Sequence, residues 1–343
     1  MSVNIIVVLV VAAPDKFRGT ASAAGIAAAV ARAVVWSGAT CDMAPVADGG
    51  EGTLEVLGGK VRTTTVRGPL GEPVAAEWRM QGDGTAVVEM ARASGLALVG
   101  GRAGNDPLRA STAGTGELVA AALDAGASRV IVGAGGSAST DGGLACLTAL
   151  NPRRRLHAGV EVLVACDVET LFVDAAEVFA PQKGATPAQV ALLRRRLERL
   201  AQIYVRDYGV DVTELPGSGA AGGLGGGLAA AGALLVPGFD LVAEALSLAE
   251  RVAAADLVVT GEGTLDAESF EGKAVGGVID LAVAAGVPVL VVAGDVLADE
   301  LPELPASVEV ISLVARFGLE RALADAAGCV EEVVGTSLRQ RAP

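Results

Sequence analysis

The chain has 343 residues, of which 52% are hydrophobic and only 3% aromatic, and its formal net charge is −14. This length is sufficient for two domains of ordinary size, and the hydrophobic share argues against a disordered chain. The excess of acidic residues argues against a nucleic-acid partner, because phosphate contacts along a nucleic acid need a broad basic surface.

The first apolar run, residues 4–13, has no basic segment before it and is shorter than the roughly 20 residues of a membrane-spanning helix. We interpret it as a buried parallel strand and expect no membrane partner. Further along, β-branched runs alternate with Ala-rich stretches, which is typical of α/β folds. Strands are predicted at 5–12, 129–133, 160–165, 257–260, 287–293 and 308–313. Helices are predicted at 22–37, 116–125, 187–204, 239–254, 276–285 and 319–327.

The pattern of apolar and polar residues changes near residue 60. Residues 62–89 alternate apolar and polar side chains between turn signals, which predicts antiparallel hairpins. The last quarter returns to strands, Gly-rich turns and helices. We therefore expect two α/β domains: residues 1–60 plus 255–343 as a discontinuous Rossmann-like or flavodoxin-like domain with a mostly parallel sheet, and residues 61–254 as a domain with a mixed sheet. The Gly/Ala-rich residues 216–238 are either a linker or, because they include an apolar stretch, a packed segment.

Cysteine and histidine usage narrows the chemistry. The four cysteines form no CxxC pair, which favours a reduced, cytoplasmic location. The single histidine, His157, argues against His-based metal sites and His–Asp triads, so acid–base work would fall to Asp, Glu or Lys.

Five glycine-bearing stretches follow apolar runs or precede helices: APDKFRGTAS, VADGGEGT, GAGGSASTDGG, PGSGAAGGLGGG and VVTGEGTLD. Glycine lets backbone N–H groups approach an anion, and a following helix N-terminus favours phosphate. We expect these stretches to form a shared anion-binding cleft at the strand ends. No Walker A sequence occurs and GAGGSASTDGG lacks the GxGxxG spacing, so NAD is disfavoured, while ATP could be held by another glycine architecture.

Phosphoryl transfer needs a carboxylate at the attacking hydroxyl, carboxylates for Mg²⁺ and cations along the phosphate. Carboxylates lie beside the glycine loops and predicted strand ends at Asp48, Glu51, Asp141, Asp167, Glu262 and Asp266; the alternative is that each caps a helix or turn. Lysine is rare in a chain rich in arginine, which favours phosphate-directed roles for the four lysines over chance placement or simple solvation: Lys16, Lys60, Lys183 and Lys273.

Eleven motifs in collinear order make the chain resemble the bacterial glycerate kinase family, which includes glycerate 2-kinases. They are APDKFRGT, ADGGEGT, GPLGEPV, AVVEMARASGL, STAGTGEL, GAGGSASTDGG, ACDV, FAPQKGAT, GAAGGLGGGL, VVTGEGTLD and GKAVGGV. The resemblance implies ATP-dependent, Mg²⁺-assisted phosphorylation of D-glycerate in a cleft between two α/β domains, usually to 2-phosphoglycerate. Two departures from the family pattern are a shortened segment between the DGG loop and ACDV, and the stretch ETLFVDAAEV after ACDV.

The matched motifs supply candidate roles. In our hypothesis Asp48 or Asp141 orients the glycerate hydroxyl, Lys16 or Lys183 neutralises phosphate charge, and Glu262 and Asp266 bind Mg²⁺. The expected substrate- and phosphate-binding residues are Arg18, Gly49, Gly50, Glu51, Gly135, Gly136 and Ser137. Which carboxylate serves as base stays open, as do phosphorylation at the 2- or 3-hydroxyl and a monomeric or homodimeric state. The alternative functions are a kinase for another small hydroxy acid and a non-catalytic sensor of a phosphorylated metabolite.

Overall fold

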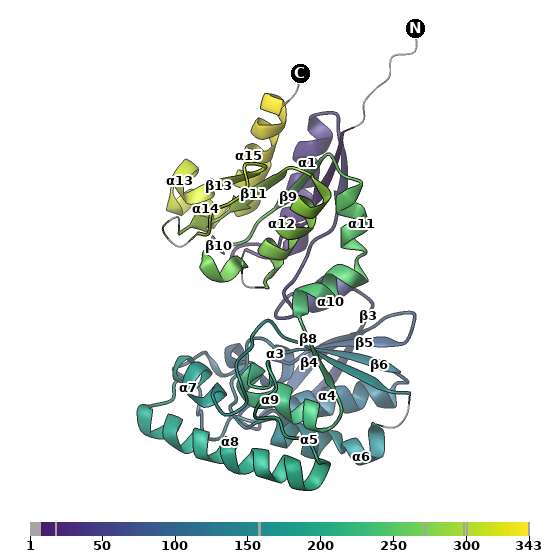
Figure 1. Ribbon diagram of the computed structural model, residues 1–343, viewed down its shortest axis with the longest axis vertical. Coiled ribbons are helices and arrows are strands. Elements are labelled where there is room, and N and C mark those ends of the chain that lie inside the picture. Colours follow the sequence, from purple (N-terminus) through teal and green to yellow (C-terminus); the bar gives the residue numbers. More distant parts are fainter. Residues whose placement is uncertain are drawn as a thin grey trace. The chain divides into compact units, whose positions relative to one another are not determined.

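The computed structural model describes residues 8–17, 19–156, 159–270, 272–297, 299 and 301–341. The chain forms two compact units (Figure 1). The first unit contains the residues up to Asp48 and those from Phe239 onward, and the second contains Gly49–Gly238. The unit boundaries thus fall earlier in the chain than the changes expected after residues 60 and 254. Each unit combines helices with its own sheet, so the predicted fold class of two α/β domains, one parallel and one mixed, is confirmed.

The sheet of the first unit is entirely parallel, with strand order β13-β11-β9-β1-β2. Counted along the chain this is the order 2-1-3-4-5 of flavodoxin-like folds. The strands predicted at 257–260, 287–293 and 308–313 are confirmed, as is the described part of the strand predicted at 5–12, whose residues before Val8 lie outside the described range. Residues 308–312 are only partly buried, and the strand at 40–43 was not predicted. The strands are β1 (Leu9–Ala12), β2 (Thr40–Met43), β9 (Leu257–Thr260), β11 (Val289–Ala293) and β13 (Val308–Ser312).

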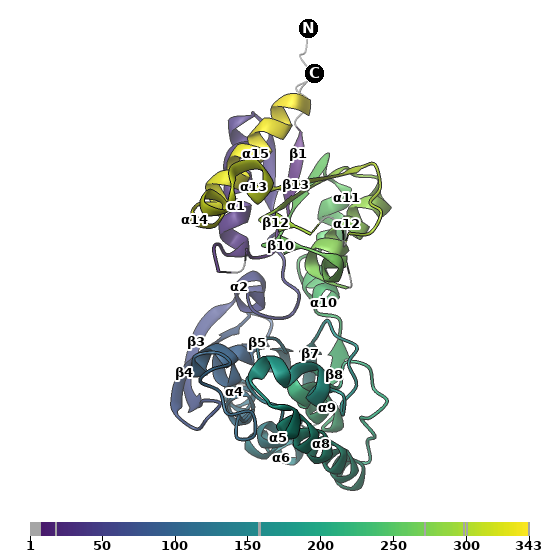
Figure 2. The same cartoon turned by 90° about the vertical axis from the view of Figure 1, so that its left-hand side faces the viewer.

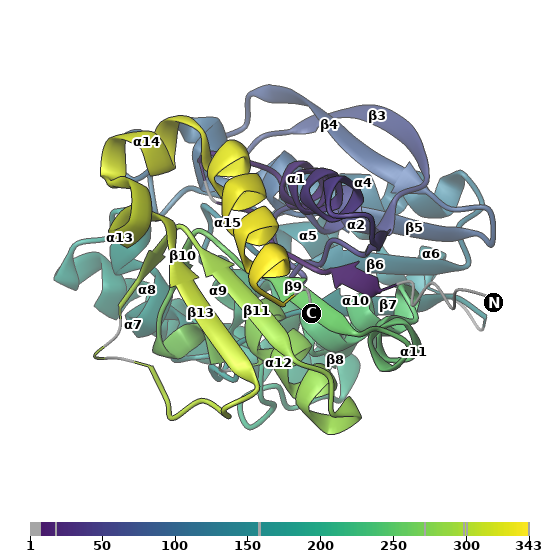
Figure 3. The ribbon, with the colours of Figure 1, turned by 90° about the horizontal axis from the view of Figure 1, so that it is seen from above.

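Helices cover both faces of this sheet, because successive side chains of a strand point to opposite sides. Val10 and Ala12 pack with α1 (Ala23–Trp36) and α15 (Ala326–Arg341), which lie side by side (Figures 2 and 3). Val11 and Ala13 pack on the other face with α11 (Leu248–Ala253) and α12 (Ala274–Ala285). The buried runs of the sequence therefore have apolar partners on both sides, which explains why they do not alternate with polar residues.

Two helices predicted in this unit as continuous are interrupted. Residues 239–254 form α10 (Gly238–Ala245) and α11, separated by Ser247 with a left-handed φ of 48°. Residues 319–327 fall in α14 (Leu319–Ala324) and the start of α15, with Asp325 outside helical geometry between them. A single residue with non-helical φ and ψ breaks the helix without changing the apolar pattern that predicted it. The smaller elements are β10 (Thr264–Leu265), η3 (Ala267–Phe270), β12 (Asp295–Val296) and α13 (Leu313–Phe317).

The sheet of the second unit is mixed, with strand order β3-β4-β5-β6-β7-β8. The first three strands pair antiparallel, which confirms the predicted hairpins, and β5 to β8 pair in parallel. The strands are β3 (Lys60–Arg67), β4 (Pro73–Met80), β5 (Thr85–Glu89), β6 (Arg129–Gly133), β7 (Glu161–Ala165) and β8 (Leu234–Val236).

The longer helices of the second unit gather on one side of its sheet, below the strands in Figure 1. They bury one apolar core with the alternate residues Val88, Val130 and Val132 of the sheet. The longest, α8, begins with a capping box between Thr186 and Gln189. The helices and turns are α2 (Thr53–Leu57), α3 (Ala91–Ser94), η1 (Leu96–Val99), α4 (Ala113–Asp124), α5 (Leu144–Leu150), α6 (Pro152–Arg155), α7 (Ala175–Phe179), η2 (Pro181–Lys183), α8 (Pro187–Tyr208) and α9 (Ala220–Ala230).

The Gly/Ala-rich segment is part of this core. All residues of α9 are buried, so the linker alternative is wrong and the packed alternative is confirmed. The helix starts with three residues in left-handed geometry, Ala221, Gly222 and Gly223. Among the helices of the described ranges, none combines the length and apolar composition needed to cross a membrane.

Candidate functional site

The first unit changes direction between β1 and β9. The helix after β1, α1, covers one face of the sheet, and α12 after β9 covers the other. In open α/β sheets the strand ends at such a switch point are where ligands bind. The two loops that leave this point are tied together, because Asp15 N donates to Gly261 O at 2.9 Å and Thr260 Oγ1 donates to Ala13 O at 2.8 Å.

A buried ion pair lies at this switch point. The Lys16 ammonium is 3.4 Å from Asp15 Oδ2 and 3.8 Å from Asp48 Oδ1. Asp15 is only 7% exposed, and burial raises its pKa to about 6, with the Asp48 charge raising it further and Lys16 lowering it. The structure therefore brings together Lys16 and Asp48, both expected from the sequence, with Asp15, which sequence analysis missed. The available signal was its place directly after a buried strand, in APDKFRGT.

Glu262 and Asp266 follow β9 in the same unit. Burial raises the pKa of Glu262 to about 7, a hydrogen bond with Ser269 and the Lys273 charge oppose this, and the charges of Asp15 and Asp266 add to it. Glu262 Oε1 is buried and, among the residues that the structure describes, has no hydrogen-bond partner. Asp266 Oδ1 accepts hydrogen bonds from Ser269 N at 3.1 Å and Ser269 Oγ at 3.2 Å, so Asp266 also caps the turn η3.

We tested whether these carboxylates fit a magnesium ion. In the described part of the chain no three His, Cys, Asp or Glu side chains are gathered as a metal cage. Mg²⁺ is nevertheless usually held by one or two protein carboxylates together with waters and substrate phosphates. The buried Glu262 Oε1, which lacks a partner within the described ranges, and the nearby Asp266 carboxylate fit that kind of site.

In the second unit, the glycines of VADGGEGT allow close backbone packing. Gly49 has a φ of +85°, and a Cβ there would lie 2.9 Å from Ala165 Cβ at the end of β7. A Cβ on Gly135, after β6, would lie 2.9 Å from Gly50 Cα. The structure thus brings Gly49, Gly50 and Gly135 together at the carboxyl ends of parallel strands, while Glu51 is exposed.

Glu89 forms hydrogen bonds with the end of this loop and was missed by sequence analysis. It ends β5, and its Oε1 accepts hydrogen bonds from Gly52 N and Leu54 N, each at 2.9 Å. Its other oxygen pairs with Arg92 at 3.2 Å, and the Glu89 side chain is 1% exposed. Glu89 therefore supplies the acceptor for the first turn of α2, which Gly52 cannot provide as a side chain. A charged residue at the end of an otherwise buried strand was the only signal.

The loop after β6 contains Gly136, Ser137 and Asp141. Gly136 has a φ of +69°, and Ser137 forms an isolated antiparallel bridge with Gly95. The Ala138 N–H in this loop already donates to Ser94 O. Asp141 accepts hydrogen bonds from Thr112 N and Oγ1, both at 2.9 Å, and from Gly143 N at 3.1 Å. Burial raises the pKa of Asp141, and these hydrogen bonds oppose the rise.

Lys183 is buried against the same loop rather than solvated. It is 3% exposed, and its ammonium donates to Ser139 O at 2.6 Å. Burial lowers the pKa of Lys183 to about 7, although the Asp141 charge opposes this. In the loop after β6, the hydroxyls of Ser139 and Thr140 are buried and, within the described ranges, without hydrogen-bond partners.

Three further residues considered in the sequence analysis are Asp167, Arg18 and His157. Asp167 Oδ1 accepts a hydrogen bond from Gly238 N at 2.9 Å, which ties the end of β7 to the residue that begins α10. Arg18 and His157 lie outside the described residues.

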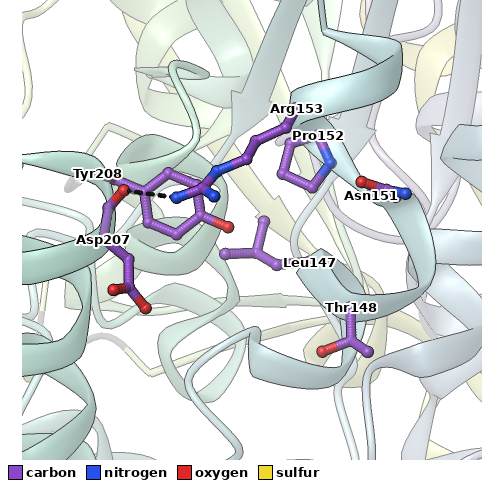
Figure 4. Close-up of a pocket in the computed structure, with 7 residues that line it drawn as sticks. All are labelled: Leu147, Thr148, Asn151, Pro152, Arg153, Asp207 and Tyr208. Atoms are coloured by element: carbon purple, nitrogen blue, oxygen red, sulfur yellow. Dashed lines mark hydrogen bonds between the residues drawn. The ribbon is translucent and has the colours of Figure 1, made fainter.

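A surface hollow of about 330 Å³ lies elsewhere in the second unit, where α5, α6 and the end of α8 meet (Figure 4). Arg153 crosses it, donates to Asp207 O at 3.1 Å and stacks over the Tyr208 ring. Its lining includes none of the candidate residues, so this hollow is not part of the candidate site.

Comparisons with known proteins agree on one family. The family model described as "Glycerate kinase family" matches residues 10–155 and 151–340. The chain is 38% identical to glycerate 2-kinase of Escherichia coli and 40% identical to glycerate kinase of Bacillus subtilis, in each case over 84% of this chain and 86% of the relative. A crystal structure of a candidate glycerate kinase 2 from Salmonella typhimurium is 35% identical, covers 98% of each chain and has a TM-score of 0.80.

Proposed function

The chain belongs to the glycerate kinase family, and from this premise we propose that it phosphorylates D-glycerate with ATP and Mg²⁺, forming 2-phosphoglycerate and ADP. The observation that carries the proposal is the group Asp15, Lys16 and Asp48 at the switch point of the parallel sheet, with Glu262 beside it. This group combines the carboxylates and the cation that phosphoryl transfer requires.

We assign the hydroxyl-orienting role to Asp48. Its carboxylate is 23% exposed and 3.8 Å from Lys16, so it can meet a substrate while staying near a cation. The carboxylate of Asp141 is instead occupied by Thr112 and Gly143, which supports a role in holding the loop after β6. A general base that accepts the hydroxyl proton in the transition state contributes about 10²–10⁴ to the rate.

The cations and the glycine loops handle the negative charge. Lys16 neutralises the transferred phosphoryl group, since its ammonium is a compact charge that can approach phosphate oxygens. When Lys183 is protonated, its ammonium adds a positive charge next to the loop after β6. We further propose that Gly135, Gly136 and Ser137 of that loop bind the anionic substrate. The other residues with this proposed role are Gly49, Gly50, Glu51 and Arg18.

Glu262 and Asp266 would hold Mg²⁺, and the bound ion would supply positive charge against the ATP phosphates. Glu262 supplies a buried oxygen without a partner, and Asp266 supplies a carboxylate that Ser269 orients. A cytoplasmic location and a monomer or homodimer complete the proposal. The four cysteines are all free, which agrees with a reducing compartment.

A coupled assay for ADP with purified protein, D-glycerate, ATP and Mg²⁺ tests the activity, and phosphorus NMR of the product tests the position of the phosphate. We expect turnover that depends on glycerate and a 2-phospho product. Absence of turnover from folded protein would reject the proposal, and a 3-phospho product would correct its regiochemistry. Equal concentrations of other small hydroxy acids test the alternative kinase function, because the shortened segment near residue 155 could alter substrate fit. Single-turnover phosphate transfer would eliminate a purely sensory role.

A further inference from the structure

The buried pair formed by Asp15 and Lys16 is unusual for neighbours in sequence. Adjacent charges at a protein surface contribute little, but here Asp15 is 7% exposed and the Lys16 side chain 14% exposed. Removing both charges from water is unfavourable, and Asp48 brings a second carboxylate to the same ammonium. Stability alone would be served better by apolar side chains, so the pair calls for a functional reason.

The contacts of Asp15 form a chain from the sheet to the Lys16 ammonium. Asp15 N donates to Gly261 O, which fixes Asp15 to the end of β9. Asp15 Oδ1 then accepts the backbone N–H of Lys16 at 2.6 Å, and Asp15 Oδ2 lies 3.4 Å from Lys16 Nζ. One carboxylate therefore holds both ends of the lysine residue, its backbone and its ammonium.

We infer that Asp15 is a positioning residue that holds Lys16 in the geometry for phosphoryl transfer. A free lysine side chain loses rotamer entropy when it is fixed, and fixing it before the substrate arrives removes that cost from the reaction. Asp15 acts through Lys16 and not on the substrate, whereas Asp48, whose side chain is more exposed, is the carboxylate proposed to contact the hydroxyl. The inference rests on the proposed function for its kinetic consequence, but the pairing itself can be tested without activity.

Lysine labelling tests the pairing in the ligand-free protein. The chain contains only four lysines, and an amine-acylating reagent followed by peptide mass spectrometry reports on each. Lys60 is exposed and serves as reference, while Lys183 is buried and reports unfolding. We expect D15N to raise the labelling rate of Lys16 relative to Lys60 severalfold and to leave Lys183 unlabelled. An unchanged ratio would overturn the inference. If D15N exposes Lys183, D15S replaces it in the same comparison.

Kinetics test whether Asp15 acts through Lys16. We expect D15N to lower kcat on the order of 100-fold, as misplacement of a catalytic group does, with the KM for glycerate little changed. The double variant D15N/K16M should be no slower than K16M, because the positioning of an absent ammonium has no effect. If the D15N factor multiplies that of K16M, the inference is wrong.

A control variant and the labelling experiment distinguish a failure of this inference from a failure of the proposed function. D42N is the control variant. Asp42 lies on β2 of the same unit, and its carboxylate pairs with Arg251 of α11 at 2.6 Å, so its removal should leave kcat unchanged. An unmodified protein without glycerate kinase activity would reject the proposed function, and the labelling ratio would then decide the Asp15–Lys16 pairing by itself.

Discussion

Lys183 Nζ lies 2.6 Å from the carbonyl oxygen of Ser139 and joins a buried ammonium to the loop after β6. The contact links two motifs that are distant in sequence, FAPQKGAT and GAGGSASTDGG. Gly222, in the left-handed turn that starts α9, closes the other side, because a Cβ there would lie 3.0 Å from Lys183 Nζ. Three motifs that are distant in sequence therefore meet at one buried lysine.

Lys183→Met tests the burial of this ammonium. Burial lowers the pKa of Lys183 from 10.5 to about 7, so between these pH values the unfolded chain holds a proton that the folded chain lacks. The free energy of unfolding of the unmodified protein should therefore gain up to about 1.4 kcal/mol per pH unit from this residue as pH rises. K183M lacks that gain. Chemical denaturation at pH 7 and pH 9 measures the free energy of unfolding. The value for K183M should fall relative to that of the unmodified protein as pH rises.

The control for this prediction is Lys60→Met, which removes an exposed lysine of β3. Its difference from the unmodified protein should be the same at both pH values. A pH-independent difference for K183M would contradict the buried, readily deprotonated state of Lys183.

Gly222→Ala should be strongly destabilising. Gly222 has a φ of +74°, and an added Cβ would collide with the Ser139 carbonyl oxygen as well as approach Lys183. We expect the free energy of unfolding to fall by about 3 kcal/mol or more, from strain and overpacking together. Gly232→Ala is the matched control, since Gly232 has a φ of +100° with no atom near the added Cβ, and should cost about 1–2 kcal/mol. Equal losses for both variants would show that the contact at Gly222 is not tight.

Asp48→Asn and Asp141→Asn should separate activity from stability. D48N is expected to lower kcat about 10²–10⁴-fold with little change in Tm, because its partly exposed carboxylate is the proposed base. D141N should lower the free energy of unfolding by about 1–3 kcal/mol, because its new amide N–H₂ would face the donors of Thr112 and Gly143. Steady-state kinetics and thermal unfolding of both variants check this. Loss of activity in D141N at unchanged stability would return the base role to Asp141.

Glu262→Gln tests the magnesium assignment. The variant keeps the shape of the side chain but removes its charge, so we expect the Mg²⁺ concentration for half-maximal activity to rise about 10- to 100-fold. D266N should shift it in the same direction. Glu250→Gln, which changes an exposed carboxylate on α11, should leave it unchanged. A magnesium titration at saturating ATP and glycerate provides the measurement, and an unchanged requirement in E262Q would remove Glu262 from the metal site.

The class of fold and the positions of the glycine loops follow from the sequence alone. Strands such as Leu257–Thr260 and Arg129–Gly133 are predicted because a strand buried on both faces must be continuously apolar. The hairpins after residue 60 follow from alternation, and the glycine loops from the need for close backbone approach at the strand ends. These features depend on neighbours within a few residues, so they are visible in one linear stretch.

Which of these residues lie close together depends on the tertiary structure. Asp15 meets Asp48 and comes within range of the Glu262 charge because β1 lies between β2 and β9, and that strand order depends on packing between segments more than 200 residues apart. The burial of Lys183 and the capping of α2 by Glu89 likewise come from distant partners. The close packing of VADGGEGT depends on the tertiary structure in the same way. Gly49 must lack a Cβ because of the Ala165 side chain, and Gly135 because of the Gly50 backbone, and local sequence encodes neither contact.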